Sequence, residues 1–214
     1  MWFGRAFLCG WWLAAVLTLL TASDPARAAA AETPLAPSEY SREGADTCLR
    51  CHDSPDVLSF FATRHAVRDD PDTPFAQLQC EGCHGPGAHH AGRLRPGQAR
   101  PPILNFGSDQ PFPLALQNGV CLDCHRADMS GGWHGSAHDA QTQACADCHR
   151  SHAREDPMLA SAAEQAEACY GCHLMVRAEL QRAYHHPVRE GEMACAECHS
   201  VHRAAAPGLL TEPT

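Results

Sequence analysis

One segment of the chain carries hydrophobic residues at helical intervals. Residues 174–185 place Leu174, Val176, Leu180 and Tyr184 near one face of a helix, and the His186-Pro187 step disfavours continuation beyond it. The pattern therefore predicts an amphipathic helix over residues 174–185.

A second segment, near the N-terminus, is apolar and uncharged. Residues 6–20 are hydrophobic except for Gly10 and Thr18, Arg5 precedes them, and small residues around Ala28 follow. The run is shorter than the roughly 20 residues that cross a bilayer. We therefore predict a cleaved signal peptide over residues 1–28, with a retained N-terminal anchor as the alternative.

Elsewhere the pattern favours irregular structure. Residues 93–119 contain five prolines, which oppose both helix and central strand, so a covering loop is expected there. Large apolar residues are few, whereas glycine and proline occur 16 times each. The sequence predicts a mainly α and irregular-loop fold with little or no β-sheet. Such a chain needs another source of apolar mass for its core.

The charge balance excludes one class of partner. Sixteen basic residues, all arginine, stand against 25 acidic ones, which gives a formal net charge of −9. No basic cluster could attract a phosphate backbone or an anionic membrane surface. Nucleic acid is therefore excluded as a partner.

The cysteines provide the strongest chemical signal. Twelve of the 13 cysteines fall into six Cys-x-x-Cys-His motifs, far more than chance predicts at this composition. Only Cys9 lies outside them, within the predicted signal peptide, so a disulfide scaffold is excluded. The motif cysteines are Cys48, Cys51, Cys80, Cys83, Cys121, Cys124, Cys145, Cys148, Cys169, Cys172, Cys195 and Cys198.

This motif is the attachment signature of c-type haem. The two thiols bond the two vinyl groups of one porphyrin, and the adjacent histidine ligates its iron. Zinc is the alternative, but the regular histidine spacing of zinc fingers does not follow these pairs. We expect six covalent haems to organise the fold, with Trp133, Phe60 and Phe61 packed against them. The proximal iron ligands are His52, His84, His125, His149, His173 and His199.

An internal repeat selects the second iron ligand. Four methionines after the signal are too few for six sites, whereas nine histidines remain. The motifs form three two-haem units, residues 48–90, 121–152 and 169–202, within one domain over residues 48–202. Thirteen residues after the first motif histidine of each unit stand His65, His138 and His186. After the second motif follow His152, His202 and, in the first unit, His89 or His90.

These positions predict two histidine ligands for every iron. Thirteen residues of helix advance about 20 Å, too far to return to the same iron. His152 and His202 are too close in sequence to their neighbouring proximal histidines to reach around the ring. We therefore expect many of these histidines to ligate a haem attached elsewhere in the chain.

Several stretches resemble the MtrA/DmsE-type decahaem cytochromes. They are residues 80–87 (CEGCHGPG), 105–107 (NFG), 136–138 (SAH) and the ending over residues 186–202. The resemblance runs from Cys48 to His202. It implies that His90, rather than His89, is the ligand after the Gly-Pro-Gly segment. It also implies a periplasmic electron carrier that docks into an outer-membrane β-barrel partner. The six motifs here predict a shorter electron path than the family's ten.

The sequence thus predicts a periplasmic hexahaem c-type cytochrome for anaerobic or extracellular electron transfer, and not an enzyme. Residues 29–47 would form a linker and residues 203–214 a tail. The expected partners are a periplasmic redox protein or an inner-membrane quinol-linked donor or acceptor, and an outer-membrane barrel. The alternatives are an oxyanion reductase with one open-site haem and a self-assembling cytochrome filament subunit.

Overall fold

The computed structural model describes residues 38–126, 133–140 and 143–202. The predicted signal peptide, residues 29–37 of the predicted linker and the tail over residues 203–214 lie outside these ranges. The described residues all belong to one compact unit of the chain, Glu32–Thr214.

Short helices joined by irregular segments make up the described residues, which contain no β-strand, so the predicted fold class is confirmed. The α-helices are α2 (Ala45–Leu49), α3 (Pro55–Leu58), α4 (Pro74–Gln77), α5 (Glu81–His84), α6 (Ala88–Ala91), α7 (Leu114–His125), α8 (Ala137–Ala140), α9 (Pro157–Ala160), α10 (Ala162–Tyr170), α11 (Leu174–Glu179) and α12 (Cys195–Cys198). The 3-10 helices are η1 (Ser59–Ala62), η2 (Arg64–Ala66) and η3 (Cys145–Asp147). None of these helices is long and apolar enough to cross a bilayer.

Polar caps explain where several short helices begin. The side chains of Ser54, Thr73 and Asp156 each accept a hydrogen bond from a backbone N–H of the first turn, and a proline follows each of them. The cap satisfies an N–H that has no partner within the helix, and proline already has the backbone angle that the first turn needs. Helices this short are unstable alone, so their packing must hold them.

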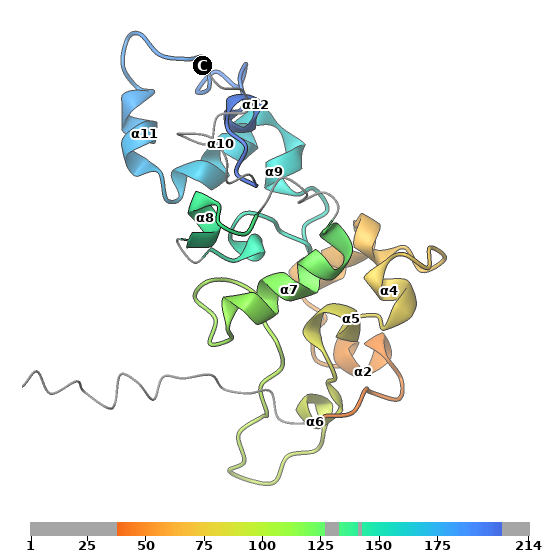
Figure 1. The fold of residues 1–214 in the computed structure, drawn as a ribbon. Coiled ribbons are helices and arrows are strands. Elements are labelled where there is room, and N and C mark those ends of the chain that lie inside the picture. The colour runs from red at the N-terminus through yellow and green to blue at the C-terminus, as the bar shows by residue number, and fades with distance from the viewer. Residues whose placement is uncertain (1–37, 127–132, 141–142, 203–214) are drawn as a thin grey trace, which may run out of the picture. The chain divides into compact units, whose positions relative to one another are not determined.

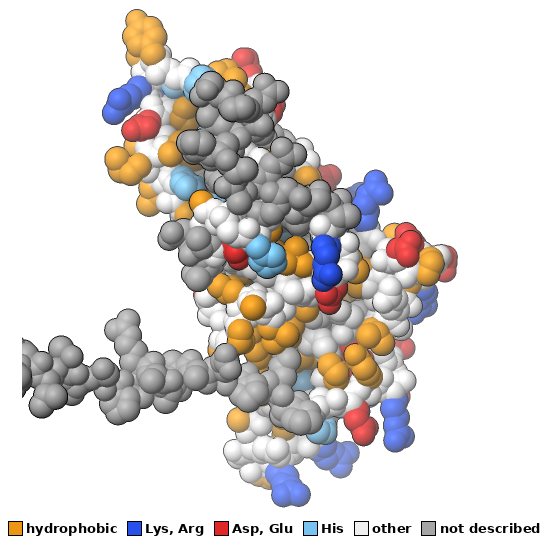
Figure 2. Space-filling model, viewed as in Figure 1, with side chains coloured by type: hydrophobic (Ala, Val, Ile, Leu, Met, Phe, Trp, Pro, Cys, Tyr) orange, Lys and Arg blue, Asp and Glu red, His pale blue; other side chains and the backbone are white. Residues whose placement is uncertain are grey.

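The core that the polypeptide forms by itself is small. Its best-defined cluster consists of Ala166, Tyr170 and Val188, with Leu180 and Met193 packed against it. Two of these residues belong to α10, which contacts α9, α11 and α12 (Figure 1). Hydrophobic side chains also lie at the surface (Figure 2), among them Leu159, Leu174, Met175 and Tyr184. This is the weak core that the composition predicts.

The predicted helix over residues 174–185 is wrong in its length. In the structure α11 ends at Glu179, and the chain turns at Leu180, whose side chain packs against the buried cluster. The carbonyl of Arg182 lies 2.6 Å from Nδ1 of His185. This side chain satisfies a carbonyl that a continuing helix would have used, so a local contact replaces the last helical turns.

The covering loop predicted over residues 93–119 is wrong at its end. Residues 114–119 belong to α7, because Pro113 has an extended backbone at the position before the first turn, where proline is tolerated. Gln117 is 1% exposed. Its amide accepts from the backbone N–H of Gly107 (2.7 Å) and donates to the carbonyl of Phe112 (2.8 Å). The segment therefore contributes to the core instead of merely covering it.

Candidate haem sites

The attachment motifs form helical turns: the third lies inside α7, and the other five share one backbone hydrogen bond. The backbone N–H of the motif histidine donates to the carbonyl of the first cysteine, as from His52 to Cys48 (3.0 Å) and from His199 to Cys195 (2.9 Å). In such a turn, residues three positions apart lie on one face. The motif thus presents two thiols and one imidazole to a common partner.

The first cysteines of the six motifs lie close together in three pairs. None of the twelve motif cysteines in the described residues forms a disulfide. The first thiols of neighbouring motifs lie close enough to shift each other's pKa in the pairs Cys48–Cys80, Cys121–Cys145 and Cys169–Cys195. The contact with Cys48 lowers the pKa of the Cys80 thiol to about 7 and raises the pKa of Cys48. The three contacts bring the attachment positions of each motif pair together.

Histidine rings of the predicted ligand set pair at a uniform distance. Each of five pairs joins one motif histidine to one of the predicted second ligands, with the two ring centroids between 5.9 and 6.1 Å apart. The pairs are His52–His90, His125–His65, His84–His152, His173–His138 and His149–His202. His186 and His199, the remaining members of the predicted set, are not among the five.

This separation fits an iron atom held between two imidazoles. A metal–nitrogen bond of about 2 Å on each side, with each ring centre about 1 Å behind its nitrogen, puts the centroids about 6 Å apart. Four of the five pairs also join different units of the predicted repeat, for example His84 with His152. The residues present therefore fit haem with two histidine ligands, in the arrangement that the predicted cross-ligation requires.

Hydrogen bonds orient three of these rings. Nδ1 of His84 lies 2.7 Å from the carbonyl of Leu104, and Nδ1 of His90 lies 2.8 Å from the carbonyl of Pro101. Nδ1 of His149 lies 2.6 Å from Oδ2 of Asp156. A ring that donates its Nδ1–H in this way presents a bare Nε2, which is the nitrogen that binds a metal.

Burial favours the neutral form of several rings. Desolvation lowers the pKa of His65, His84, His152 and His202 below the ordinary histidine value. Neutral imidazole is the form that ligates a metal ion. The electrostatics of these four positions therefore suit iron ligands.

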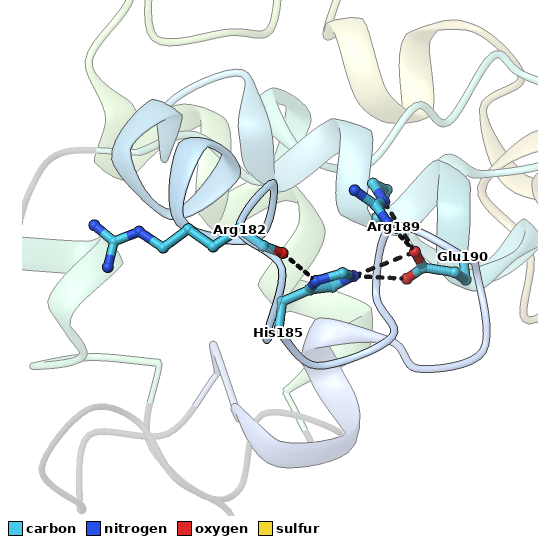
Figure 3. A network of polar contacts seen from close by, with 4 residues as sticks. All are labelled: Arg182, His185, Arg189 and Glu190. Atoms are coloured by element: carbon cyan, nitrogen blue, oxygen red, sulfur yellow. Dashed lines mark hydrogen bonds and ion pairs between the residues drawn. The ribbon is translucent and has the colours of Figure 1, made fainter.

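The surplus histidines have other surroundings. His185 has Nδ1 near the carbonyl of Arg182 and Nε2 3.2 Å from the carboxylate of Glu190, which Arg189 also contacts (Figure 3). Both of its ring nitrogens are therefore engaged within the chain. His89 and His134 are exposed, as is His186, the neighbour of His185 that the repeat selects as a ligand.

Two of the three aromatic residues predicted to pack against haem, Trp133 and Phe60, lie beside ligand candidates. Trp133 is 7% exposed, and its ring centroid lies 6.1 Å from that of His202. The ring centroid of Phe60 lies 5.4 Å from that of His152, and the ring centroid of Phe61 lies 5.8 Å from that of Phe60.

Three buried polar atoms of the described residues have no hydrogen-bond partner: Thr63 Oγ1, His138 Nδ1 and Tyr170 OH. Buried polar atoms are nearly always satisfied, so these three fit a further group such as the haem carboxylates.

Sequence reasoning missed the residues that orient the ligands. Asp156 stands seven positions after His149, and its only sequence signal is that of a helix cap before Pro157. The carbonyls of Pro101 and Leu104 belong to the segment that was expected to be only a cover. Glu81 was also missed: it is 5% exposed and accepts from the backbone N–H groups of Ser41 and Gly87.

Comparisons with known proteins identify relatives for most of the chain. Residues 80–163 match the family described as cytochrome c-type protein NrfB-like, and residues 185–214 match the doubled CXXCH motif. The chain is 36% identical over 181 residues to the multiheme cytochrome MtrA of Shewanella baltica (strain OS185). This match covers 84% of the chain and 52% of that protein, so the chain spans about half the length of the curated relative. The matches agree with covalent c-type haem at the motifs.

Proposed function

The chain is a multihaem c-type cytochrome of the MtrA type, and from this premise we propose that it carries electrons between redox partners through six covalent haems. The observation that carries the proposal is the set of five histidine pairs with centroids 5.9 to 6.1 Å apart. Each pair contains one motif histidine, and each leaves the space of one iron between the rings.

Each residue type has a defined role in this proposal. The motif cysteines would hold the cofactor by thioether bonds, and the two histidines of each pair would ligate its iron. For the sixth site these roles would fall to His199 and His186. Bound haem would supply a one-electron couple between ferric and ferrous iron. Because the chain offers two histidines to each iron, none would be left open to a substrate, which favours electron transfer over catalysis.

The attachment positions also support a path that follows the sequence. Thiol contacts join motifs one and two, three and four, and five and six. Burial, followed by the charges of Cys121 and Cys124, raises the pKa of Cys83 to about 11, so motif two lies near motif three. The charge of Cys172 acts on Cys148, so motif four lies near motif five. Each motif therefore has its sequence neighbours as spatial neighbours.

We further propose that the protein works in the periplasm, in anaerobic or extracellular electron transfer. The support is the apolar N-terminal segment over residues 6–20, which has the form of an export signal, together with the relation to MtrA. The proposed partners are a periplasmic or inner-membrane quinol-linked donor or acceptor on one side and an outer-membrane β-barrel on the other.

The experiment is a measurement of haem stoichiometry and spin state on the purified holoprotein. We expect the intact mass to exceed the processed polypeptide by six haems. Near-infrared magnetic circular dichroism should show low-spin iron with two histidine ligands. A mass short of six haems, zinc in the metal analysis, or a substantial high-spin fraction would contradict the proposal.

A further inference from the structure

The bond between His149 and Asp156 differs from the other described ring contacts of the ligand histidines. His84 and His90 meet neutral backbone carbonyls, whereas His149 meets a carboxylate at 2.6 Å. A charged acceptor at this distance makes a stronger hydrogen bond than a carbonyl does. The fourth motif therefore combines a ligand candidate with a charged hydrogen-bond acceptor.

The structure holds the Asp156 carboxylate in place from both sides. Oδ1 accepts the backbone N–H of Met158 (3.0 Å) as the N-cap of α9, while Oδ2 meets His149. The Asp156 side chain is 20% exposed and that of His149 is 35% exposed. Partial burial and two fixed partners keep this contact stronger than a surface ion pair would be.

Asp156 also lies where two sites approach each other. Its charge acts on His65 and opposes the fall in pKa that burial causes there. His65 pairs with His125 of the third motif. One carboxylate therefore bonds a ligand candidate of the fourth site and lies within electrostatic range of a ligand candidate of the third.

A carboxylate that accepts the Nδ1–H of an iron-bound imidazole increases the electron donation of that ring to the metal. Stronger donation stabilises the ferric state relative to the ferrous state and lowers the reduction potential, and hydrogen bonding of this kind is one of the means by which a protein tunes its haem. The negative charge acts in the same direction, because reduction adds an electron to the site.

We propose that Asp156 is a positioning residue that lowers the reduction potential of the haem attached at Cys145 and Cys148 and so makes the fourth site a low-potential step inside the row of six. This inference rests on the proposed function, since it requires haem with His149 as a ligand. One electron that passes from the third site to the fourth oxidises the former and reduces the latter. Asp156 makes that transfer less favourable and makes the onward transfer to the fifth site more favourable.

The test is a redox titration of the Asp156→Asn holoprotein, with dithionite as the electron donor and ferricyanide as the acceptor. Asparagine can still cap α9 but removes the charge. We expect one of six couples to move to higher potential by a factor of about ten in its reduction equilibrium, or about 59 mV for one electron. The other five should move less.

Asp147→Asn is the matched control. Asp147 lies inside the same motif, but its carboxylate accepts from the backbone N–H groups of Ser108 and Ala144. Its loss removes a nearby charge without touching the His149 contact, so we expect a smaller shift than in Asp156→Asn. Equal shifts in the two variants would overturn the role of the hydrogen bond.

The outcomes separate this inference from the proposed function. Six unchanged couples in a six-haem, low-spin Asp156→Asn protein would overturn the inference and leave the proposed function intact. A wild-type protein with fewer than six haems would contradict the proposed function itself. If the asparagine variant loses a haem, Asp156→Ser, which also caps a helix, replaces it in the same titration with the same expected shift.

Discussion

Two regions of the molecule share one frame, a buried amide that holds the backbone of the next motif. They are the region of motifs three and four and the region of motifs five and six. In the first, Oδ1 of Asn118 on α7 accepts the backbone N–H of Cys145 (2.9 Å). In the second, Oε1 of Gln165 on α10 accepts the backbone N–H of Ala196 (2.8 Å). Both amides are buried, and in both regions the first thiols of the two motifs are in contact.

The fourth haem site, attached in the first region, and the fifth haem site, attached in the second, differ in how a ligand ring is held. His149 bonds Asp156, and its ring lies at 27° to that of His202. In the neighbouring pair, His138 has a buried Nδ1 without a partner, and its ring lies at 90° to that of His173. The comparison indicates that the repeat predicts which histidines pair, while residues outside the motifs, such as Asp156, determine how a ring is oriented and polarised.

Removal of a second ligand should have the largest effect in both regions. In His202→Ala and in His138→Ala we expect six attached haems, because the cysteines are unchanged, with one iron converted to the high-spin state. Its potential should rise, because the loss of a histidine ligand weakens the preference for ferric iron. EPR of the ferric protein and a redox titration measure both effects.

His134→Ala and His185→Ala are the controls, since the repeat assigns neither residue to iron. Both should remain fully low-spin. A high-spin signal in His185→Ala, or its absence in both ligand variants, would show that the register of the repeat is wrong.

Ring orientation should divide the ferric EPR spectrum into two classes. Near-parallel imidazoles split the iron d orbitals strongly and give a rhombic low-spin signal. Near-perpendicular imidazoles leave these orbitals almost degenerate and give one very large g value. The pairs at 22° and 27°, His52–His90 and His149–His202, belong to the first class. The pairs at 75°, 88° and 90° belong to the second.

The ligand variants sharpen this assignment. His202→Ala should remove intensity from the rhombic class, and His138→Ala should remove intensity from the large-g class. The same loss in both variants would mean that the two regions do not differ in ring orientation.

The sequence predicted the parts of this molecule that depend on spacing. The six motifs and the stretches at residues 80–87, 105–107 and 136–138 predicted a multihaem cytochrome related to MtrA, which the comparisons confirm. The assignment of His90 and His138 as ligands stays a prediction, although the ring pairs support it. Two local features were less predictable, because both depend on side-chain contacts. One is the end of α11, where His185 bonds Arg182, and the other is the contact of Asp156 with His149.

The smallest expected effect concerns the shared frame. Asn118→Ala leaves the N–H of Cys145 and the carbonyl of Gln143 without their side-chain partner. Gln165→Ala does the same to Ala196 and to Met158. A buried group that loses its partner costs roughly 1–3 kcal/mol, and the gain in helix propensity on substitution by alanine offsets part of this. We expect each variant to lower the free energy of unfolding by about 1–2 kcal/mol, measured by urea denaturation followed by circular dichroism.

The comparison between the two regions predicts that these losses are alike, because each buried amide accepts a backbone N–H from one of the first two residues of the next motif. Neither amide touches a ligand ring or carries a charge, so EPR spectra and potentials should stay at their wild-type values in both alanine variants. A loss confined to one region, or a shifted potential in Gln165→Ala, would mean that the frame is not shared and that the amides also tune the iron. Equal losses of unfolding free energy with unchanged spectra would show that Asn118 and Gln165 only bring the motifs together. Residues such as Asp156 would then be the ones that set the haem potentials.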